Sequence, residues 1–600
     1  MRIAVLIKQI PKFETMSLGS DGRLNRADQM LEMNAYCRRA VSKAVEIGAT
    51  DVANEVVIFT LGPESADDVL REAIAWGDIQ GCGHVRGVHI CDAAFAGSDT
   101  LATARTLVAA LRGDGDFDLI LCGRNSIDAD TGQVGPQVAE LLGIEFVSSA
   151  REIALDGNTV HAVGELDDGV MTVETQIPVL ISCAERLCEP SKVEPEFRAQ
   201  VNSSRIVVMT SSELGEGPWG QAASPTRVGD LRSITVERTR LTWPELDLNS
   251  QVDKAIAAIR DRHAIATPPV KAAALGPLRR SHGPAVVALI EPGRSHTSAE
   301  LLGSAAMLAA GCGGYAVGIG PSEAVERCAL GNLGADMTVA IHGSDTESDL
   351  ATTIAAWLRE HPTTILLAPS TAWGREIASR IAARTSSGLT GDAIDLELVD
   401  GRLVAWKPAF GGAVVAAITS ESPLQLVTVR AGVLCVPIPR NASAPHSVIT
   451  ASSRSQLRVL SRTRDDDIDV LADAEVVIGV GRGVDPAKYA EFDQLRRFLA
   501  AEFGATRKVT DVGWLPRARQ IGITGRSVSP ELFISVAASG KFNHSVGYRN
   551  AKTVLAINSD PGAPVFSTAD IGIISEWSDA IRLLAERSSE LPFGQAFSGR

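Results

Sequence analysis

One segment pattern occurs twice in this chain, and the repeat constrains the fold more than any other feature. Each copy runs through an apolar strand, a second strand, a Gly-Pro turn, helices and a further buried strand. A repeat of this kind indicates duplicated supersecondary units, and alternating strands and helices predict a mostly parallel sheet with helices on both faces. The strands are expected at 3–7, 56–59 and 119–121 in the first copy, and at 285–290, 316–319 and 365–367 in the second.

The two copies diverge in the loop after the last of these strands. Residues 123–135 are polar and rich in glycine, whereas residues 368–374 are fewer and contain one glycine. Ligands of open α/β sheets bind outside the carboxyl ends of the strands, so the longer loop predicts a ligand site. Asp128 and Asp130 suggest a metal loop, but no third carboxylate follows at calcium-loop spacing. A backbone nest for a phosphate at the start of the next helix fits better; alternatively, Asp130 or Thr131 simply caps that helix.

Composition excludes several classes of protein. The 600 residues have ordinary hydrophobic content of 45% and a net charge of −15, which disfavours binding to nucleic acid or an anionic membrane. No apolar stretch reaches the roughly 18 residues of a membrane span, and the N-terminus is predicted to be a strand rather than a signal peptide. The nine cysteines form no Cys-x-x-Cys pair, which argues against structural zinc and iron–sulfur clusters and favours a reducing cytoplasm. No hydrolase or P-loop motif is present.

The chain is expected to form two related doubly wound α/β units and a C-terminal Rossmann-like domain. A strand leads into the glycine-rich turn Gly479-Val-Gly-Arg-Gly483, a helix is predicted at 488–503, and further strands at 532–536 and 553–557. Pro- and Ser/Arg-rich sequence from 437 to 464 is interpreted as a boundary. The predicted segments are 1–265, with an extended arm from about 199 that includes a helix at 251–262, then a linker at 266–284, then 285–455 and 456–600.

Polar loops of the third segment predict a cofactor site. Thr506-Arg507 and the loops at 520–525, 539–544 and 558–560 offer hydroxyls, amides, an imidazole and cations. Such groups suit a large ligand with phosphates, hydroxyls and a heteroaromatic ring. Taken singly, His544 is more typical of a structural histidine and Thr524 of a turn, so the clustering carries the prediction.

At these loops the chain resembles electron-transfer flavoproteins, and the similarity covers nearly all of it. Residues 1 to about 198 resemble the β subunit, notably at Met33-Asn-Ala-Tyr-Cys37, the 128–135 loop and Glu174-Thr-Gln-Ile-Pro178. Residues 285–600 resemble the α subunit, at Lys407-Pro-Ala-Phe-Gly-Gly412, Asp511-Val-Gly-Trp514 and Gly522-Ile-Thr-Gly525 among others. The resemblance implies both subunits fused in one chain, β first.

The resemblance further implies FAD in the third segment. Arg482 and Thr506 would contact the pyrophosphate, Arg507 would lie against the isoalloxazine, and Thr524 and His544 would donate to its N5 and approach its C2 carbonyl. Cations and donors at that edge raise the flavin potential. Ile523, Lys541, Asn543 and Glu576 depart from the family pattern. The implied FAD-binding residues are Arg482, Gly483, Thr506, Arg507, Gln520, Ile521, Gly522, Ile523, Thr524, Gly525, Ser539, Gly540, Lys541, Phe542, Asn543, His544, Asn558, Asp560 and Glu576.

The first copy is expected to hold AMP, or alternatively a second FAD. Cys37 stands where bifurcating relatives tend to carry an acidic residue, which favours AMP. No metal ligands and no catalytic residues are predicted. The expected nucleotide-binding residues are Leu6, Asn34, Cys37, Leu61, Gly123, Ser126, Asp128, Asp130, Thr131, Gly132, Gln133 and Val134.

Three functions follow from these features. The first is a cytoplasmic electron carrier rather than a stand-alone enzyme. It would take electrons from flavin dehydrogenases, such as the acyl-CoA dehydrogenases of fatty acid β-oxidation, and pass them to a membrane quinone reductase or another acceptor. The second is an electron-bifurcating flavoprotein that oxidises NADH with a second FAD in the N-terminal site. The third is an adenine-nucleotide sensor without a redox role. The loop that would contact dehydrogenases is expected between Cys188 and Ser204.

Overall fold

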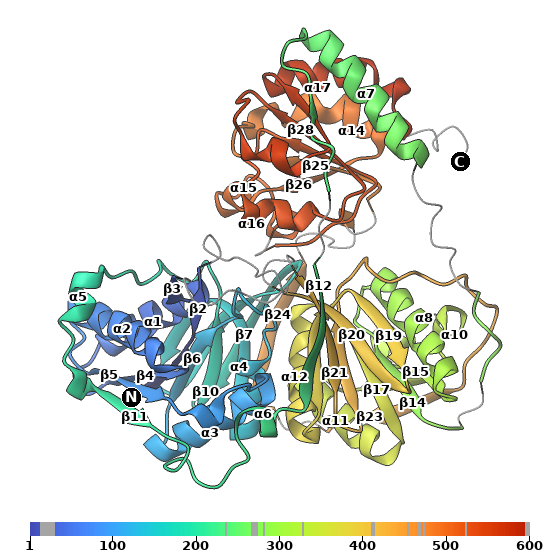
Figure 1. Ribbon diagram of the computed structural model, residues 1–600. Helices are drawn as coiled ribbons and strands as arrows, with labels where there is room; N and C mark the ends of the chain where they lie inside the picture. The colour runs from blue at the N-terminus through green and yellow to red at the C-terminus, as the bar shows by residue number, and fades with distance from the viewer. Residues whose placement is uncertain are drawn as a thin grey trace.

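The computed structural model shows two α/β units side by side and a third domain placed above both (Figure 1). The expected α/β class with parallel sheets is confirmed. The structure describes residues 1–12, 30–233, 237–265, 274–279, 282–326, 329–409, 414–452, 455–464, 470–471, 474–522 and 525–593.

The first unit is built on a parallel sheet whose apolar strands are buried on both faces. Its core strands follow the order β5-β4-β1-β6-β10-β7. Helices α1 (Ala35–Gly48) and α2 (Asp67–Ile79) cover one face, and α3 (Thr100–Asp114) and α4 (Val134–Leu142) cover the other. The strands are β1 (Arg2–Ile7), β4 (Glu55–Leu61), β5 (Val85–Ile90), β6 (Leu119–Gly123), β7 (Glu145–Asp156) and β10 (Val179–Cys183).

The second unit repeats this topology strand for strand, in the order β16-β15-β14-β17-β22-β18. Helix α8 (Ser295–Gly311) covers one face, and α11 (Glu347–Glu360) and α12 (Ala372–Thr385) cover the other. An extra parallel strand lies at the equivalent edge of each sheet, β11 (Ile206–Met209) in the first unit and β23 (His446–Thr450) in the second. The core strands are β14 (Ala285–Leu289), β15 (Tyr315–Pro321), β16 (Met337–His342), β17 (Thr363–Pro369), β18 (Gly388–Ala393) and β22 (Gln425–Val429).

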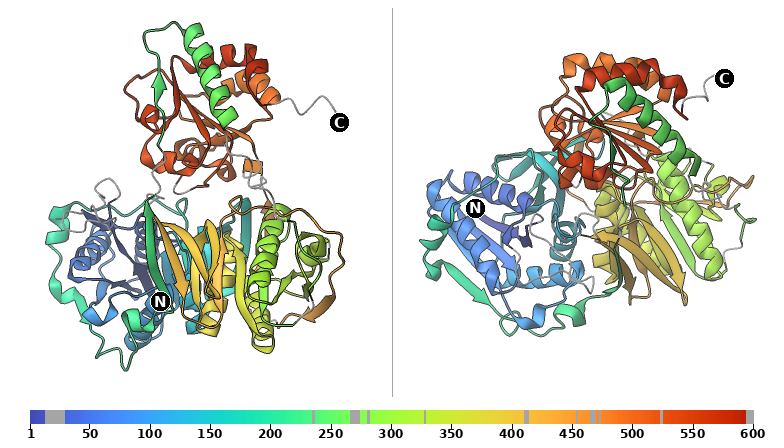
Figure 2. Two further views of the ribbon diagram at one scale, coloured as in Figure 1. Left: turned by 45° about the vertical axis from the view of Figure 1, so that its right-hand side comes forward. Right: turned by 45° about the horizontal axis from the view of Figure 1, so that its top comes forward.

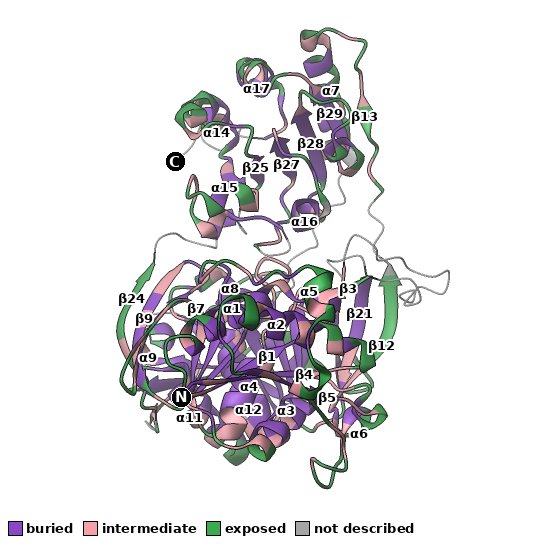
Figure 3. Ribbon diagram, turned by 90° about the vertical axis from the view of Figure 1, so that its left-hand side faces the viewer, coloured by how far each residue is buried: buried purple, intermediate pink, exposed green. Residues whose placement is uncertain are grey.

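The two units exchange edge strands. β12 (Thr226–Ser233), from the arm after the first unit, pairs antiparallel with β21 (Val414–Ser420) of the second. In return β24 (Arg458–Arg464), after the second unit, pairs antiparallel with β9 (Gly169–Gln176) of the first. Both exchanged strands lie at exposed edges (Figure 3). The segment interpreted from sequence as a boundary therefore contains strands β23 and β24.

The third domain has a parallel sheet in the order β29-β28-β27-β25-β26, a doubly wound arrangement. The helix expected at 488–503 is wrong at its end. Ala500 adopts a left-handed conformation with φ +48°, which ends helix α14 (Asp493–Leu499), and the following residues form a strand. The strands are β25 (Val476–Val480), β26 (Glu502–Ala505), β27 (Leu532–Val536), β28 (Thr553–Asn558) and β29 (Ile571–Ile574).

The arm that follows the first unit also completes the third domain (Figure 2). Strand β13 (Leu241–Thr242) pairs with β29, and helix α7 (Leu248–Ile265) covers the sheet. Helix α7 buries Val252, Ile256 and Ile259 in the core of the third domain. The helix expected at 251–262 is present, and it packs on a domain that lies more than 200 residues later in the chain.

Candidate functional site

Chain topology creates equivalent crevices in the first and second units. In the first unit the chain passes to opposite faces of the sheet after β1 and after β6, so a crevice opens at the carboxyl ends of these adjacent strands. In the second unit the same point lies between β14 and β17. We call them the first crevice and the second crevice.

The loop after β6 shapes the first crevice. Asp130 and Gly132 both adopt left-handed conformations, with φ of +46° and +65°. Alternation of this kind turns backbone N–H groups toward one point, which makes an anion-binding concavity. Gln133 is the N-cap of α4 and makes no side-chain cap bond. Neither Asp130 nor Thr131 therefore caps this helix, and the alternative of a plain helix cap is wrong.

Polar contacts hold that loop against the other loops of the first crevice. Asn34 Nδ2 donates to Asn125 O at 2.8 Å, and its Oδ1 accepts from Ile127 N at 3.2 Å. Lys8 Nζ, just after β1, lies 2.8 Å from Asp128 Oδ2. Buried Gln133 Nε2 has no hydrogen-bond partner among the described residues, and it lies beside Gly391 of β18 in the second unit.

The structure gathers the expected nucleotide-binding residues around the first crevice. Leu6 and Leu61 lie in β1 and β4. Asn34 and Cys37 lie at the start of α1, where both are buried. The remaining residues form the loop from β6 to α4: Gly123, Ser126, Asp128, Asp130, Thr131, Gly132, Gln133 and Val134.

A third crevice lies in the third domain, between β25 and β27, where the strand order again reverses. Its two loops approach without room for side chains. A Cβ on Gly481 would lie 2.1 Å from Ala537 O, and Gly540, at φ +71°, packs its backbone against Val565. Close approach of glycine backbone is what binding of a pyrophosphate requires.

His544 is the most informative side chain of the third domain. Its Nδ1 lies 2.9 Å from Ile521 O, and because a carbonyl only accepts, this nitrogen carries the proton. Burial lowers the pKa of His544 to about 4, so the ring is neutral near pH 7. Its Nε2 is buried and has no partner among the described residues. A buried, unsatisfied ring nitrogen is uncommon in a folded domain and indicates a ligand contact.

The other expected FAD residues also lie at the carboxyl ends of this sheet. Gln520, Ile521 and Gly540 are buried, whereas Arg482, Ser539 and Glu576 are exposed. Asn558 Nδ2 donates to Ala538 O at 3.0 Å, which joins the loops after β27 and β28. Ile523 and Thr524 lie outside the described residues, and the side chains of Phe542 and Asn543 are not described. The remaining residues follow β25, β26, β27 and β28 or lie in the turn after 520: Gly483, Thr506, Arg507, Gly522, Gly525, Lys541 and Asp560.

Ion pairs join the third domain to the first unit. Arg507 Nη1 lies 3.0 Å from Glu185 Oε1, and Arg517 Nη1 lies 2.9 Å from Glu185 Oε2. Burial alone would raise the pKa of Glu185, but Arg517, Arg507 and Arg124 hold it below the ordinary value. The Glu185 carboxylate therefore stays charged. Arg507 of the third domain, the residue expected beside the isoalloxazine, forms its ion pair with this carboxylate of the first unit.

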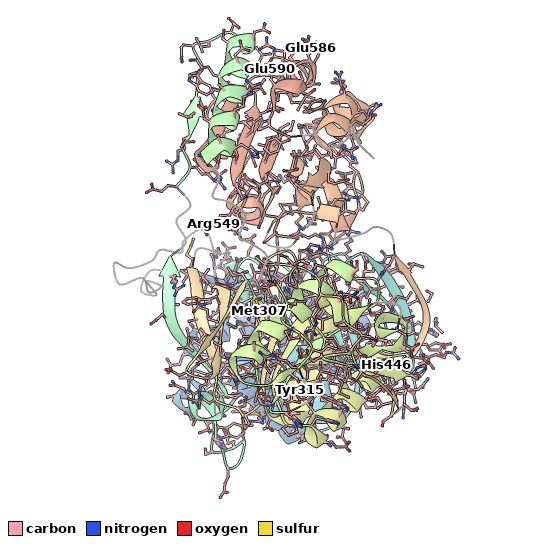
Figure 4. All side chains as sticks on the ribbon, turned by 90° about the vertical axis from the view of Figure 1, so that its right-hand side faces the viewer. Met307, Tyr315, His446, Arg549, Glu586 and Glu590 are labelled. Carbon is pink, nitrogen blue, oxygen red and sulfur yellow. The ribbon has the colours of Figure 1, made fainter. Side chains whose placement is uncertain are left out.

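A cavity of about 210 Å³ lies where the three bodies meet. Asp128 and Asp130 of the first crevice line it together with Gly522 and Gly525 of the third domain. Arg549, another lining residue, lies on the side of the third domain that faces the two units, whereas Glu586 and Glu590 lie at its far end (Figure 4). The two expected nucleotide sites therefore open into one cavity.

Sequence reasoning missed the charged residues that line this junction. Arg124, Glu165, Asp167, Arg375, Asp392 and Arg430 all line the cavity. Buried Asp392 pairs with Arg430, whose Nη1 donates to Ser527 Oγ of the third domain at 2.8 Å. Because these residues come from both units, no local pattern of the sequence assigned them a role.

Two absences concern the described residues alone. None of their helices combines the length and the hydropathy that crossing a membrane would require. In the same ranges, His, Cys, Asp and Glu side chains form no group of three that would hold a metal ion.

Fold and crevices define a parallel α/β protein with nucleotide-type sites, and comparison with known proteins identifies the family. The electron transfer flavoprotein domain matches residues 21–207 and 293–454, and the electron transfer flavoprotein FAD-binding domain matches residues 470–549. The chain belongs to the electron transfer flavoprotein family.

Relatives of both subunit types are similar to this chain. The electron transfer flavoprotein subunit alpha of Thermoanaerobacterium thermosaccharolyticum is 32% identical over 49% of this chain and 93% of that protein. Subunit beta of the same organism is 30% identical over 44% of this chain and 100% of that protein. Protein FixB of Rhizobium meliloti is 32% identical over 49% of this chain and 88% of that protein.

Proposed function

We propose that this chain is a fused electron carrier, with the β-type part first and the α-type part second. FAD binds in the third domain and AMP in the first crevice. Electrons come from flavin dehydrogenases of the acyl-CoA dehydrogenase type and leave to a quinone reductase or another acceptor. Similarity to both subunit types supports the fusion, and the match to an FAD-binding domain supports the cofactor.

One observation carries the placement of FAD. Residues from five separate loops converge at the carboxyl ends of β25 to β29, around buried His544 with its unsatisfied Nε2. FAD supplies reversible one- and two-electron chemistry when bound. The chain would contribute glycine backbone at the pyrophosphate, His544 at the pyrimidine edge of the ring and a positive charge from Arg507.

A short helix is the proposed contact for dehydrogenases. Helix α5 (Pro195–Ala199) lies in the segment expected to meet them and exposes Phe197, 49% accessible. Arg198 holds this helix on α2 through Asp68 at 2.8 Å and Glu72 at 3.1 Å. An exposed aromatic side chain on an anchored helix is suited to a partner's apolar pocket. Phe197→Ala should slow reduction by the dehydrogenase while leaving the flavin potential unchanged; an unchanged rate would count against this surface.

The first test is the nucleotide content of the purified protein, from its visible spectrum and from chromatography of the nucleotides released by denaturation. One FAD and one AMP per chain would support the carrier. A colourless protein that cannot be reconstituted with FAD would remove the electron-transfer proposal and favour the nucleotide sensor.

A bifurcating flavoprotein is the second candidate, with a second FAD in the first crevice. The shared cavity favours it, because Asp130 and Gly525 line the same space and a ligand in each site would approach the other there. Two FAD per chain together with NADH oxidation would establish this alternative over the carrier.

The charge of Arg507 is proposed to raise the flavin potential. Arg507→Ala should lower the measured midpoint potential, because a cation near the ring stabilises its reduced, negatively charged forms. Arg497→Ala, which removes an exposed arginine from α14 of the same domain, should leave the potential unchanged. Equal potentials in both variants would defeat this role.

A further inference from the structure

An acidic turn of the first unit enters the second crevice, whose loop at 369–372 also lines the shared cavity. The hairpin of β8 (Thr159–Glu165) and β9 closes through Leu166 N, which donates to Gly169 O at 2.9 Å. The turn between them carries two neighbouring carboxylates, Asp167 and Asp168. Each one contacts a different side of the second crevice, so the turn spans it.

Asp167 binds the start of helix α12. Its Oδ2 accepts from Ala372 N, the first residue of this 14-residue helix, at 2.7 Å. The N-cap Thr371 accepts from Gly374 N through its own hydroxyl at 3.1 Å. The helix N-terminus is therefore satisfied by one cap within the second unit and by one carboxylate from the first. A helix start is where a phosphate binds in nucleotide-type units.

Asp168 binds the opposite side, formed by the loop after β14. Its Oδ2 lies 2.8 Å from Arg294 Nη2, and the two side chains are only 5% and 2% exposed. Arg464 of the exchanged strand β24 adds a second cation, with its Nε 3.2 Å from the same oxygen. A buried carboxylate with two guanidinium partners is a specific contact, because removing one partner leaves a buried charge uncompensated.

We propose that the second crevice is a carboxylate receptor whose ligand is the 167–168 turn of the first unit, so that it docks the two units and binds no nucleotide. The partner it fits is a tight turn with two adjacent acidic side chains. The proposal concerns assembly and does not depend on the electron-carrier function.

The lining of the second crevice disfavours a phosphate in place of the turn. Glu291, directly after β14 and buried, lies with Oε1 3.7 Å from Arg294 Nε, and its Oε2 accepts from Thr371 Oγ1 at 2.8 Å. This carboxyl group occupies the space next to Thr371 and, whenever it is ionised, would repel a phosphate dianion. The loop between β17 and α12 is also too short to form a nest like that of the first crevice.

The third domain contacts the backbone of the same turn. Arg526 Nη2 donates to Asp167 O at 2.8 Å. The turn therefore meets the second unit, the exchanged strand and the third domain. Loss of its carboxylates should loosen the second unit first, since both carboxylates point there.

Hydrogen–deuterium exchange of the full chain with its native cofactors tests the proposal. The variants are Asp168→Asn, Arg294→Gln and the double variant. The matched control is Glu189→Gln/Glu216→Gln, which removes charge from exposed side chains of the first unit and its arm. Exchange is followed in peptides covering 159–176 and 370–380.

Each single variant is expected to speed exchange in both peptides by about tenfold, because a buried charge loses its partner. The double variant should be no faster than the faster single variant, since the pair acts as one contact. Rates equal to those of the control, or a double variant equal to the product of the two effects, would overturn the proposal. If Arg294→Gln does not fold, Asp167→Asn and Asp168→Asn, which preserve side-chain volume, decide by the same comparison.

Discussion

The first and second crevices share one topology and differ in what fills them. In the first, a long loop with left-handed residues at Asp130 and Gly132 forms a backbone concavity. In the second, a short loop leads into a capped helix whose first N–H is taken by Asp167. The second crevice receives a turn of the chain itself, although its loop at 369–372 still lines the shared cavity, whereas the loop of the first crevice presents a backbone concavity.

The difference shows how a duplicated scaffold acquires two uses. Charges across the interface are complementary. The first unit places carboxylates in the second crevice, and the second unit places an ammonium group beside the first crevice. Lys407 Nζ, from β20 (Arg402–Ala409), donates to Ala129 O at 2.8 Å, inside the nucleotide loop. Loop length and a few charged side chains therefore distinguish the two crevices.

The largest expected effect comes from a substitution that breaks the Asp168–Arg294 ion pair of the second crevice. Arg294→Met should lower the free energy of unfolding by about 3 kcal/mol, because it leaves Asp168 buried without its principal partner. The equivalent loop of the first unit carries the exposed Lys8–Asp128 pair, and Lys8→Met should cost less than about 1 kcal/mol. Urea titration followed by tryptophan fluorescence compares them, since Trp373 lies in α12. Equal losses would show that the two crevices do not differ in this way.

The second effect is a pH dependence that belongs to the second crevice alone. Burial raises the pKa of Glu291 to about 7; Asp167 and Asp168 also raise it, while Arg294 and Thr371 lower it. Because the folded pKa exceeds the unfolded one, stability is greatest below about pH 4.5 for this group and declines as pH rises to about 7. The loss should approach about 2–3 kcal/mol. Burial also raises the pKa of Glu376 in α12 to about 7, so Glu291→Gln should make this part of the stability profile less steep without removing the slope. A slope equal to that of the wild type would contradict the assignment.

The third prediction alters the loop of the first crevice. Asp130→Ala should weaken nucleotide binding about tenfold, because alanine tolerates the left-handed conformation poorly and the hydrogen bond from Asn125 is lost. Asp130→Asn, which keeps the conformation and an acceptor, should change affinity less than about threefold. Calorimetry measures the AMP affinity of both variants after AMP has been removed from the first crevice. Retained FAD shows that each variant is folded. Identical affinities in the two variants would remove the conformational argument.

The smallest expected effect tests whether Lys407 of the second unit supports the loop of the first crevice. Lys407→Met should reduce nucleotide affinity about fivefold, because the charged donor that fixes Ala129 O is lost. Lys407→Arg keeps a charged donor and should recover most of the affinity. The same titration gives both values, and an unaffected Lys407→Met variant would show that the second unit does not support the first crevice.

Local patterns predicted much of the fold, because apolar strands and amphipathic helices are short-range signals. They identified three of the six core strands in each copy and the helix of the arm. They missed β24, whose sequence Arg458–Arg464 is exposed at nearly every position and lacks the apolar run of a core strand. They also extended a helix through Ala500, where only the backbone conformation shows that it ends.

The site was predictable where its residues follow strands directly. Loops after strands were expected to converge, and the structure gathers them in the first crevice and in the third domain. The contacts of Asp167 with Ala372 and of Lys407 with Ala129 span more than 200 residues of chain. No local pattern encodes which partner such a side chain meets, so the closed second crevice emerges only from the fold.

Native mass spectrometry of the wild type, Asp130→Ala and Asp167→Asn/Asp168→Asn would test the central contrast most directly, by counting bound nucleotides per chain. The account predicts one FAD and one further nucleotide in the wild type, a clearly lower occupancy of the further nucleotide in Asp130→Ala, and unchanged occupancy in Asp167→Asn/Asp168→Asn. Loss from the second variant with retention in the first would place the ligand in the second crevice and contradict the account.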